Sequence, residues 1–167
     1  NQAMMDLGAT VCLPNGAPKC EICPARMMCE AYKNGLTEVL PVRAKKKSRR
    51  VEERTVLLLF QDGRIALRKR PDTGLLAGLW EYPNLPESLD EAGALLALAQ
   101  LGLSAESIIP AGSARHIFTH IEWDMKGYFA KVRGESDGLI WADADAFDAL
   151  ALPTAFKKYT ALVRARL

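Results

Sequence analysis

The order of apolar and polar positions predicts that a folded domain begins near residue 55. Residues 56–60 form a continuous apolar run, which is typical of a strand buried on both faces. Residues 61–64 (Gln-Asp-Gly-Arg) predict a hairpin turn, because Asp-Gly tolerates positive φ, and residues 65–69 alternate as the partner strand. Further strands are predicted over residues 108–111, 116–123, 127–132 and 139–141.

A helix is predicted in the middle of this domain. Ser88 followed by Glu91 has the spacing of a capping box, and the helix that it opens should run to about Leu101, with Gly102 as its stop. Helical periodicity predicts its inward face. The residues expected on that face are Ala92, Leu95, Leu96 and Ala99.

A second helix is predicted at the end of the chain. Thr154, which follows Pro153, is the expected N-cap. Phe156, Tyr159 and Val163 should then lie along one side and pack inward. Strands, one helix, more strands and a terminal helix predict an α+β fold.

The first 54 residues follow a different pattern. Residues 1–7 have helical spacing with Gly8 as a plausible C-cap, and we interpret them as the tail of a helix from a longer parent protein. A short helical turn over residues 30–35 ends in Asn-Gly. The organisation expected is therefore residues 1–35 with their cysteines, a linker over 36–54 and a domain over 55–167.

Composition and charge change this outline in one respect. The 167 residues carry a net charge of +2, but residues 1–54 hold ten Lys and Arg against six Asp and Glu. The basic part of the chain is the expected polyanion-facing side. No apolar run approaches the roughly 20 residues that span a bilayer, so no membrane partner is expected and the cytoplasm is the default compartment.

The linker concentrates this positive charge. Six basic residues fall within eight positions, and such a run rarely folds, because like charges repel and nothing apolar is buried. Two compatible interpretations stay open, a solvated hinge and a set of DNA phosphate contacts. The six residues are Arg43, Lys45, Lys46, Lys47, Arg49 and Arg50.

All four cysteines fall in one short stretch, with gaps of seven, two and five residues between them. They are Cys12, Cys20, Cys23 and Cys29. Four soft thiolates on short loops suit a cubane iron–sulfur cluster or a tetrahedral zinc ion. Structural zinc usually shows two Cys-x-x-Cys knuckles and only one is present, while disulfides would need an oxidising compartment.

Residues 1–12 and the cysteine spacing resemble the last helix and cluster loop of the A/G-specific adenine DNA glycosylases (MutY family). That loop usually has six residues between its first two cysteines, and this chain has seven. The resemblance implies that the four cysteines hold a [4Fe–4S] cluster, with zinc as the alternative. It also implies that the basic linker, with Leu40-Pro41-Val42 before it, runs beside DNA.

The second domain resembles the Nudix fold through its order of elements and the motif Gly-x-Trp-Glu-Tyr-Pro at residues 78–83. A Nudix hydrolase then carries helix glutamates that hold magnesium. Here Leu96, Ala99 and Gln100 fill those positions, and none offers the carboxylate that magnesium needs. The same pattern marks the MutY family's C-terminal domain, a Nudix-like mixed sheet that reads a damaged base.

Residues 116–120 contain both histidines of the chain. From the pattern alone they form a strand with Ile117 and Thr119 inward and the histidines on the surface. Two histidines four apart on one strand face suggest a metal site, but no third ligand is obvious. The MutY family places Phe-Ser-His here, in a loop that touches 8-oxoguanine. The resemblance implies lesion recognition by Phe118, Thr119 and His120, with Phe118 wedged against the base stack and Thr119 in place of the serine.

The resemblance implies a function for the whole chain. The family's catalytic carboxylates lie upstream of the cluster, so this part should bind double-stranded DNA with an adenine:8-oxoguanine mispair, as a monomer, without catalysing excision. Two alternatives stay open: a Nudix-type nucleotide diphosphate hydrolase and a zinc-binding adaptor.

Overall fold

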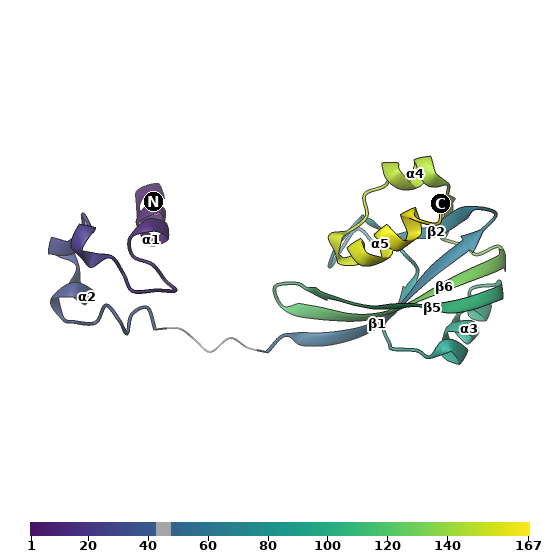
Figure 1. The fold of residues 1–167 in the computed structure, drawn as a ribbon, viewed down its shortest axis with the longest axis horizontal. Coiled ribbons are helices and arrows are strands. Elements are labelled where there is room, and N and C mark those ends of the chain that lie inside the picture. The colour runs from purple at the N-terminus through teal and green to yellow at the C-terminus, as the bar shows by residue number, and fades with distance from the viewer. Residues whose placement is uncertain (43–47) are drawn as a thin grey trace. The chain divides into compact units, whose positions relative to one another are not determined.

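The computed structural model describes residues 1–42 and 48–167, so the predicted phosphate contacts Arg43, Lys45, Lys46 and Lys47 lie outside the described residues. The chain divides into two compact units, residues 1–48 and 49–167. Figure 1 shows both units. Among the described residues, no helix has the length and apolar character needed to cross a membrane.

The first unit consists of short helical segments joined by turns. Its elements are α1 (Gln2–Thr10), η1 (Cys20–Ile22), η2 (Arg26–Met28) and α2 (Glu30–Lys33). The expected C-cap at Gly8 is wrong, because α1 continues to Thr10 and its C-cap is Val11. The predicted turn over residues 30–35 is confirmed, and Gly35 ends it with φ of +64°.

The second unit is a seven-stranded mixed sheet with helices on both faces. Its path is β3-β2-β1-β6-β5, with β4 beside β1 and β7 beside β2. The strands are β1 (Arg50–Gln61), β2 (Arg64–Lys69), β3 (Trp80–Glu81), β4 (Asn84–Leu85), β5 (Leu103–Ile117), β6 (Ile121–Gly134) and β7 (Ile140–Ala142). The helices are α3 (Glu91–Gln100), α4 (Ala144–Ala149), η3 (Thr154–Phe156) and α5 (Lys157–Arg164).

Two apolar layers hold this sheet. The run at residues 56–59 is buried on both faces, as its pattern predicts: Val56 and Leu58 contribute to the layer on one face, and Leu57 and Leu59 to the layer on the other. Figure 1 shows α4 and α5 on one face and α3 on the other. The predicted Asp-Gly turn is confirmed, because Asp62 and Gly63 both have positive φ.

The position of α3 differs from the prediction. Asp90, not Ser88, caps the helix, because its carboxylate accepts from the backbone N–H of Gly93 at 2.8 Å. The face that packs on the sheet is correspondingly different. Its buried residues are Ala94, Ala97 and Leu98, whereas Leu95 and Leu96 are exposed. Alanines on this face let the helix backbone lie close to the sheet.

Two boundaries and one helix also differ from the prediction. Strand β1 begins at Arg50 rather than near residue 55, because it pairs in parallel with β6 from Ile121 onward. Residues 144–149 form a helix that the pattern did not predict, capped by the Asp143 carboxylate. The terminal helix opens with a 3₁₀ turn in which Thr154 makes no capping bond, although its predicted inward residues are buried.

Candidate functional site

The predicted lesion loop is the tip of a long hairpin. Residues 116–123 do not form one strand, as the pattern predicted, because β5 ends at Ile117 and β6 begins at Ile121. The backbone N–H of Phe118 donates to the carbonyl of Ile121 at 2.8 Å and closes the turn. Thr119 and His120 are exposed at this tip. The two histidines therefore do not line one strand face as metal ligands would.

The start of β1 lies beside this tip. Arg50 pairs with Ile121 in the parallel register, and its backbone N–H donates to the carbonyl of His120 at 3.4 Å. Arg49 and Arg50 are exposed there. Parallel pairing thus brings two of the predicted phosphate contacts next to the predicted lesion loop, although some 70 residues separate them in sequence. We call the surface formed by Arg49, Arg50 and residues 115–121 the hairpin tip.

Phe118 points toward the interior and not outward from the tip. Its ring lies edge-on to His116, with centroids 4.5 Å apart, and edge-on to Trp123, with centroids 5.0 Å apart. Trp123 is fully buried in the apolar layer on the α5 face, and Phe118 packs against that layer. The Phe118 side chain therefore anchors the loop to the apolar layer by packing against it.

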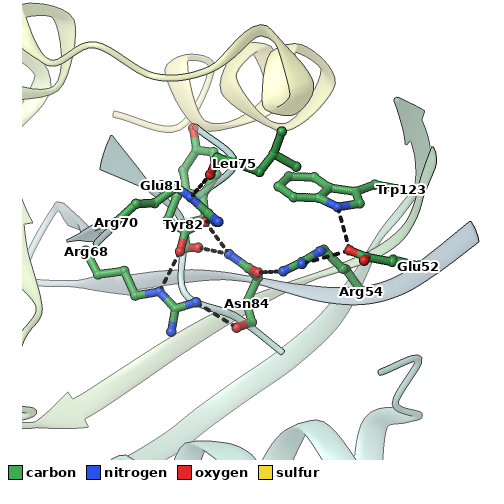
Figure 2. A network of polar contacts seen from close by, with 9 residues as sticks. All are labelled: Glu52, Arg54, Arg68, Arg70, Leu75, Glu81, Tyr82, Asn84 and Trp123. Atoms are coloured by element: carbon green, nitrogen blue, oxygen red, sulfur yellow. Dashed lines mark hydrogen bonds and ion pairs between the residues drawn. The ribbon is translucent and has the colours of Figure 1, made fainter. Parts of the chain in front are cut away.

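A polar network continues from Trp123 into the sheet (Figure 2). The indole Nε1 of Trp123 donates to Glu52 Oε2 at 3.1 Å, and Arg54 donates to the same oxygen at 3.2 Å. The Arg54 guanidinium also lies over the Trp123 ring, 4.2 Å from its centroid. Arg50 donates to the other carboxylate oxygen of Glu52. Glu52 therefore joins the buried indole to an arginine of the hairpin tip.

The electrostatics of Glu52 follow from these bonds. Its partial burial acts to raise the pKa of the carboxyl, but hydrogen bonds from Arg54, Arg50 and Trp123 outweigh that effect and hold the pKa below its ordinary value. The carboxylate is therefore the stable form at neutral pH. An ionised Glu52 keeps all three donors in place.

The other half of the network surrounds Glu81, which is 2% exposed (Figure 2). Arg68 donates to one carboxylate oxygen at 2.9 Å and Arg70 to the other at 2.5 Å. Asn84 links the two halves, because its amide donates to Glu81 at 2.9 Å and its carbonyl oxygen accepts from Arg54 at 2.8 Å. The glutamate of the Gly-x-Trp-Glu-Tyr-Pro motif thus has a structural role here.

Sequence reasoning missed the residues of this network. Glu52 and Arg54 lie in the stretch predicted to be a linker, and Trp123 is predicted only as the end of a strand. The alternation of Arg50, Glu52 and Arg54 is a period-2 signal that could have marked one strand face.

The helix face that would carry magnesium ligands in a Nudix hydrolase is visible on α3. Leu96, Ala99 and Gln100 are all exposed there, so this face is open to solvent and carries no carboxylate at those positions. Magnesium binding needs oxygen ligands, and these side chains supply at most one amide. The second unit therefore presents a Nudix-like scaffold without that metal chemistry.

The four cysteines of the first unit line one pocket of about 820 Å³. The backbone N–H of Lys19 donates to the carbonyl of Val11 at 2.9 Å, which brings the residues that follow each, Cys20 and Cys12, to the same side. Cys23 follows η1 directly and Cys29 follows η2, so short helical turns position the other two thiols. The thiols are free and partly or largely accessible.

The thiols affect one another electrostatically. Desolvation raises the pKa of the Cys20 thiol, and the neighbouring Cys23, Cys29 and Cys12 raise it further. Within residues 1–42 and 48–167, no three His, Cys, Asp or Glu side chains converge on a single metal ion. A [4Fe–4S] cluster takes four cysteine thiolates as ligands, and this pocket is lined by four thiols.

Comparisons with known proteins identify the family to which this chain belongs. The sequence model of the NUDIX domain matches residues 55–162, and the chain belongs to that family. Its relatives include adenine DNA glycosylases of human (28% identity) and mouse (30% identity), each matched over 95% of this chain. The chain spans only 39% and 41% of the length of these two relatives.

Solved structures agree on the fold. The C-terminal domain of mouse MUTYH, in a complex with human PCNA, matches 70% of this chain and 91% of its own, with a TM-score of 0.53 at 24% identity. A MutT NUDIX hydrolase from Burkholderia pseudomallei matches 71% of this chain and 99% of its own, with a TM-score of 0.52 at 22% identity. The α+β, Nudix-like architecture expected from the sequence is confirmed.

Proposed function

We propose that this chain is the C-terminal part of an adenine DNA glycosylase that removes adenine mispaired with 8-oxoguanine. In this proposal the second unit binds duplex DNA at the hairpin tip and reads the damaged base. The observation that carries it is the exposed Thr119 at the tip of a hairpin whose turn lies beside Arg49 and Arg50. The relatives named adenine DNA glycosylase support the same activity for the parent protein.

The chemistry of the lesion suits a hydroxyl. 8-Oxoguanine differs from guanine at two adjacent atoms, because N7 becomes an N–H donor and C8 gains an oxygen acceptor. A hydroxyl both donates and accepts, so Thr119 can accept from N7–H while a neighbouring backbone or side-chain donor serves the C8 oxygen. Guanine has an N7 acceptor and no C8 oxygen, so the hydroxyl would have to reverse and donate to N7, and the donor that serves the C8 oxygen would lose its partner.

The other residues of the tip have supporting roles. Phe118 holds the turn in position on the sheet through its contacts with His116 and Trp123. His120, Arg49 and Arg50 are exposed at the tip, and in this proposal they contact phosphates, which position a protein on DNA without reading sequence. The remaining basic residues of the linker, namely Arg43, Lys45, Lys46 and Lys47, extend the same role on the strength of the sequence alone.

We further propose a [4Fe–4S] cluster as the group held in the first unit, with zinc as the alternative. Cys12, Cys20, Cys23 and Cys29 would be its ligands, and their common pocket supports that assignment. The cluster would supply folding free energy to a unit that has few apolar contacts. Iron analysis and absorbance at about 400 nm distinguish the cluster from zinc.

In this proposal, the residues that excise adenine belong to the part of the parent protein upstream of this chain. We expect the chain alone to release no adenine, to act as a monomer on DNA and to work in the bacterial cytoplasm, where the DNA lies.

The test is lesion preference, measured as the ratio of affinities for duplexes with adenine opposite 8-oxoguanine and adenine opposite guanine. Thr119→Val should lower this ratio, because it removes a polar contact worth about 1–3 kcal/mol of discrimination. Thr119→Ser keeps the hydroxyl and should keep the ratio. Thr73→Val, in another exposed loop, is the matched control. A folded Thr119→Val protein with full discrimination would overturn the proposed reading role.

A further inference from the structure

One arginine side chain connects three short helical segments of the first unit. Arg26 belongs to η2, and its Nη1 donates to Glu21 Oε2 of η1 at 2.8 Å. Its Nη2 donates to the hydroxyl of Tyr32 in α2, and the guanidinium carbon lies 4.5 Å from the centroid of the Tyr32 ring. Arg26 therefore holds η1, η2 and α2 together through its side chain.

These three segments position three of the four cysteines. Cys20 opens η1, Cys23 follows that turn, and Cys29 is the N-cap of α2. The main chain of Arg26 is bonded to two of them. Its N–H donates to the carbonyl of Cys23 at 3.1 Å, and its carbonyl accepts from the N–H of Cys29 at 3.2 Å. A displacement of Arg26 would therefore move the backbone at Cys23 and Cys29.

The position of Arg26 also suits a negatively charged group in the cysteine pocket. Arg26 and Tyr32 line that pocket together with the four cysteines, and among the described residues the other charged ones that line it are Lys19 and Glu38. Four thiolates leave an oxidised [4Fe–4S] cluster with a net negative charge, and net charge is one determinant of its reduction potential. An exposed ion pair alone contributes little, but this guanidinium has two hydrogen-bond partners and an aromatic neighbour.

We propose that Arg26 is a positioning residue for the cluster: it holds Cys20, Cys23 and Cys29 in place and supplies a positive charge to their pocket. The inference rests on the [4Fe–4S] cluster proposed above. Residues that hold metal ligands in place, without binding the metal themselves, typically contribute about 10–100-fold to its affinity. The planar fork of arginine suits this role, because it bonds two partners on different segments at once.

The test is the rate at which a chelator removes iron from the whole chain, after iron and sulfide have been supplied under anaerobic conditions. Arg26→Gln is too short to bond both partners and should lose iron about tenfold faster than the wild type. The cluster that remains should be harder to reduce, because a cation has left the pocket, whereas a purely structural role would leave the reduction potential unchanged.

Lys33→Gln is the matched control. It removes the same charge from the same unit, but Lys33 pairs with Glu30 inside α2 at 3.0 Å and does not line the cysteine pocket. It should change neither the rate of iron loss nor the reduction potential.

Three further variants separate the side-chain bonds from the charge. Glu21→Ala and Tyr32→Phe each remove one acceptor and leave Arg26 in the chain, so each should speed iron loss. Neither should add its full effect to that of Arg26→Gln in a double variant, because residues in one network are not additive. Arg26→Lys keeps the charge without the fork, so it should keep the wild-type potential and still lose iron faster.

The outcomes separate this inference from the cofactor on which it rests. If the wild-type chain holds no iron, the proposed cluster is wrong and the role of Arg26 falls with it. If the wild type holds iron but Arg26→Gln loses it at the same rate, or if Glu21→Ala and Tyr32→Phe both match the wild type, the cluster stands and the positioning role is wrong. An unchanged potential in Arg26→Gln would overturn the charge assigned to Arg26. If Arg26→Gln binds no iron at all, the two milder variants decide.

Discussion

Residues 1–42 contain no buried residue, whereas the sheet of residues 49–167 buries large side chains on both faces. The helices of the first unit are short, and their apolar side chains, such as Met27 and Met28, are mostly exposed. The second unit has layers built on Trp123 and Leu57, each covered by helices. A unit without a core of this kind needs another source of folding free energy, and the cluster proposed for the pocket lined by four thiols would supply it.

The largest expected effect follows from that difference. Cys20→Ser should abolish bound iron and the absorbance near about 400 nm, and should unfold the first unit, because its ligand set is then incomplete. The second unit should remain folded, since its two apolar layers involve no residue of the first. Hydrogen exchange, read separately for residues 1–42 and 49–167, measures both results.

Met27→Ser is the control for that experiment, because Met27 lies between two of the cysteines and is 83% exposed. It should retain iron and protection from exchange. Cooperative loss of protection in both units of Cys20→Ser would show that they do not fold independently, and the comparison drawn above would be wrong.

Within the second unit, the core on the α5 face should dominate stability. Phe156 is fully buried, with its ring 5.7 Å from that of Tyr82 and 5.9 Å from that of Trp123. Phe156→Ala should lower the free energy of unfolding by about 3–5 kcal/mol, because it leaves a cavity among aromatic side chains. Leu96→Ala, at the 68% exposed position on α3, should change it by less than about 0.5 kcal/mol. Urea unfolding followed by tryptophan fluorescence measures both, and equal effects would contradict this assignment of the core.

The sequence predicted those parts of the fold that depend on local pattern. The apolar run at 56–59, the Asp62-Gly63 turn and the inward residues Phe156 and Tyr159 are confirmed, because periodicity and turn chemistry determine them. The inward face of α3 was predicted wrongly, because alanines and leucines alternate around the whole helix and periodicity has no contrast to detect.

Features that depend on long-range pairing were out of reach. Strand β1 extends back to Arg50 because β6 pairs with it there. Residues 50–54 are mostly charged, so the sequence pattern does not predict a strand in this stretch. The same pairing creates the hairpin tip and the contact of Trp123 with Glu52, some 70 residues apart. The predicted contact of Phe118 with the base stack stays a prediction. That the Phe118 ring packs against the apolar layer on the α5 face could not be predicted, because it depends on which face of the sheet α5 covers.

The smallest expected effect concerns the bond between Glu52 and Trp123. The lowered pKa of Glu52 means that its carboxylate stabilises the folded second unit above the ordinary glutamate pKa of about 4.3. That contribution is lost as the pH falls through the lower folded-state pKa, where the carboxylate is protonated. Glu52→Gln lacks the charge at every pH, so it should cost about 1 kcal/mol at neutral pH and progressively less below about pH 4.

Urea unfolding of both proteins at neutral and acidic pH measures this convergence. Glu135→Gln, at an exposed position, is the control and should match the wild type throughout. Because Glu52 also holds Arg50 and Trp123, the variant should loosen the hairpin tip at neutral pH, seen as faster exchange of the amides of Phe118 and Ile121. A constant stability difference at all pH values would mean that the charge of Glu52 contributes nothing, and unchanged exchange would mean that the tip is held by aromatic packing alone.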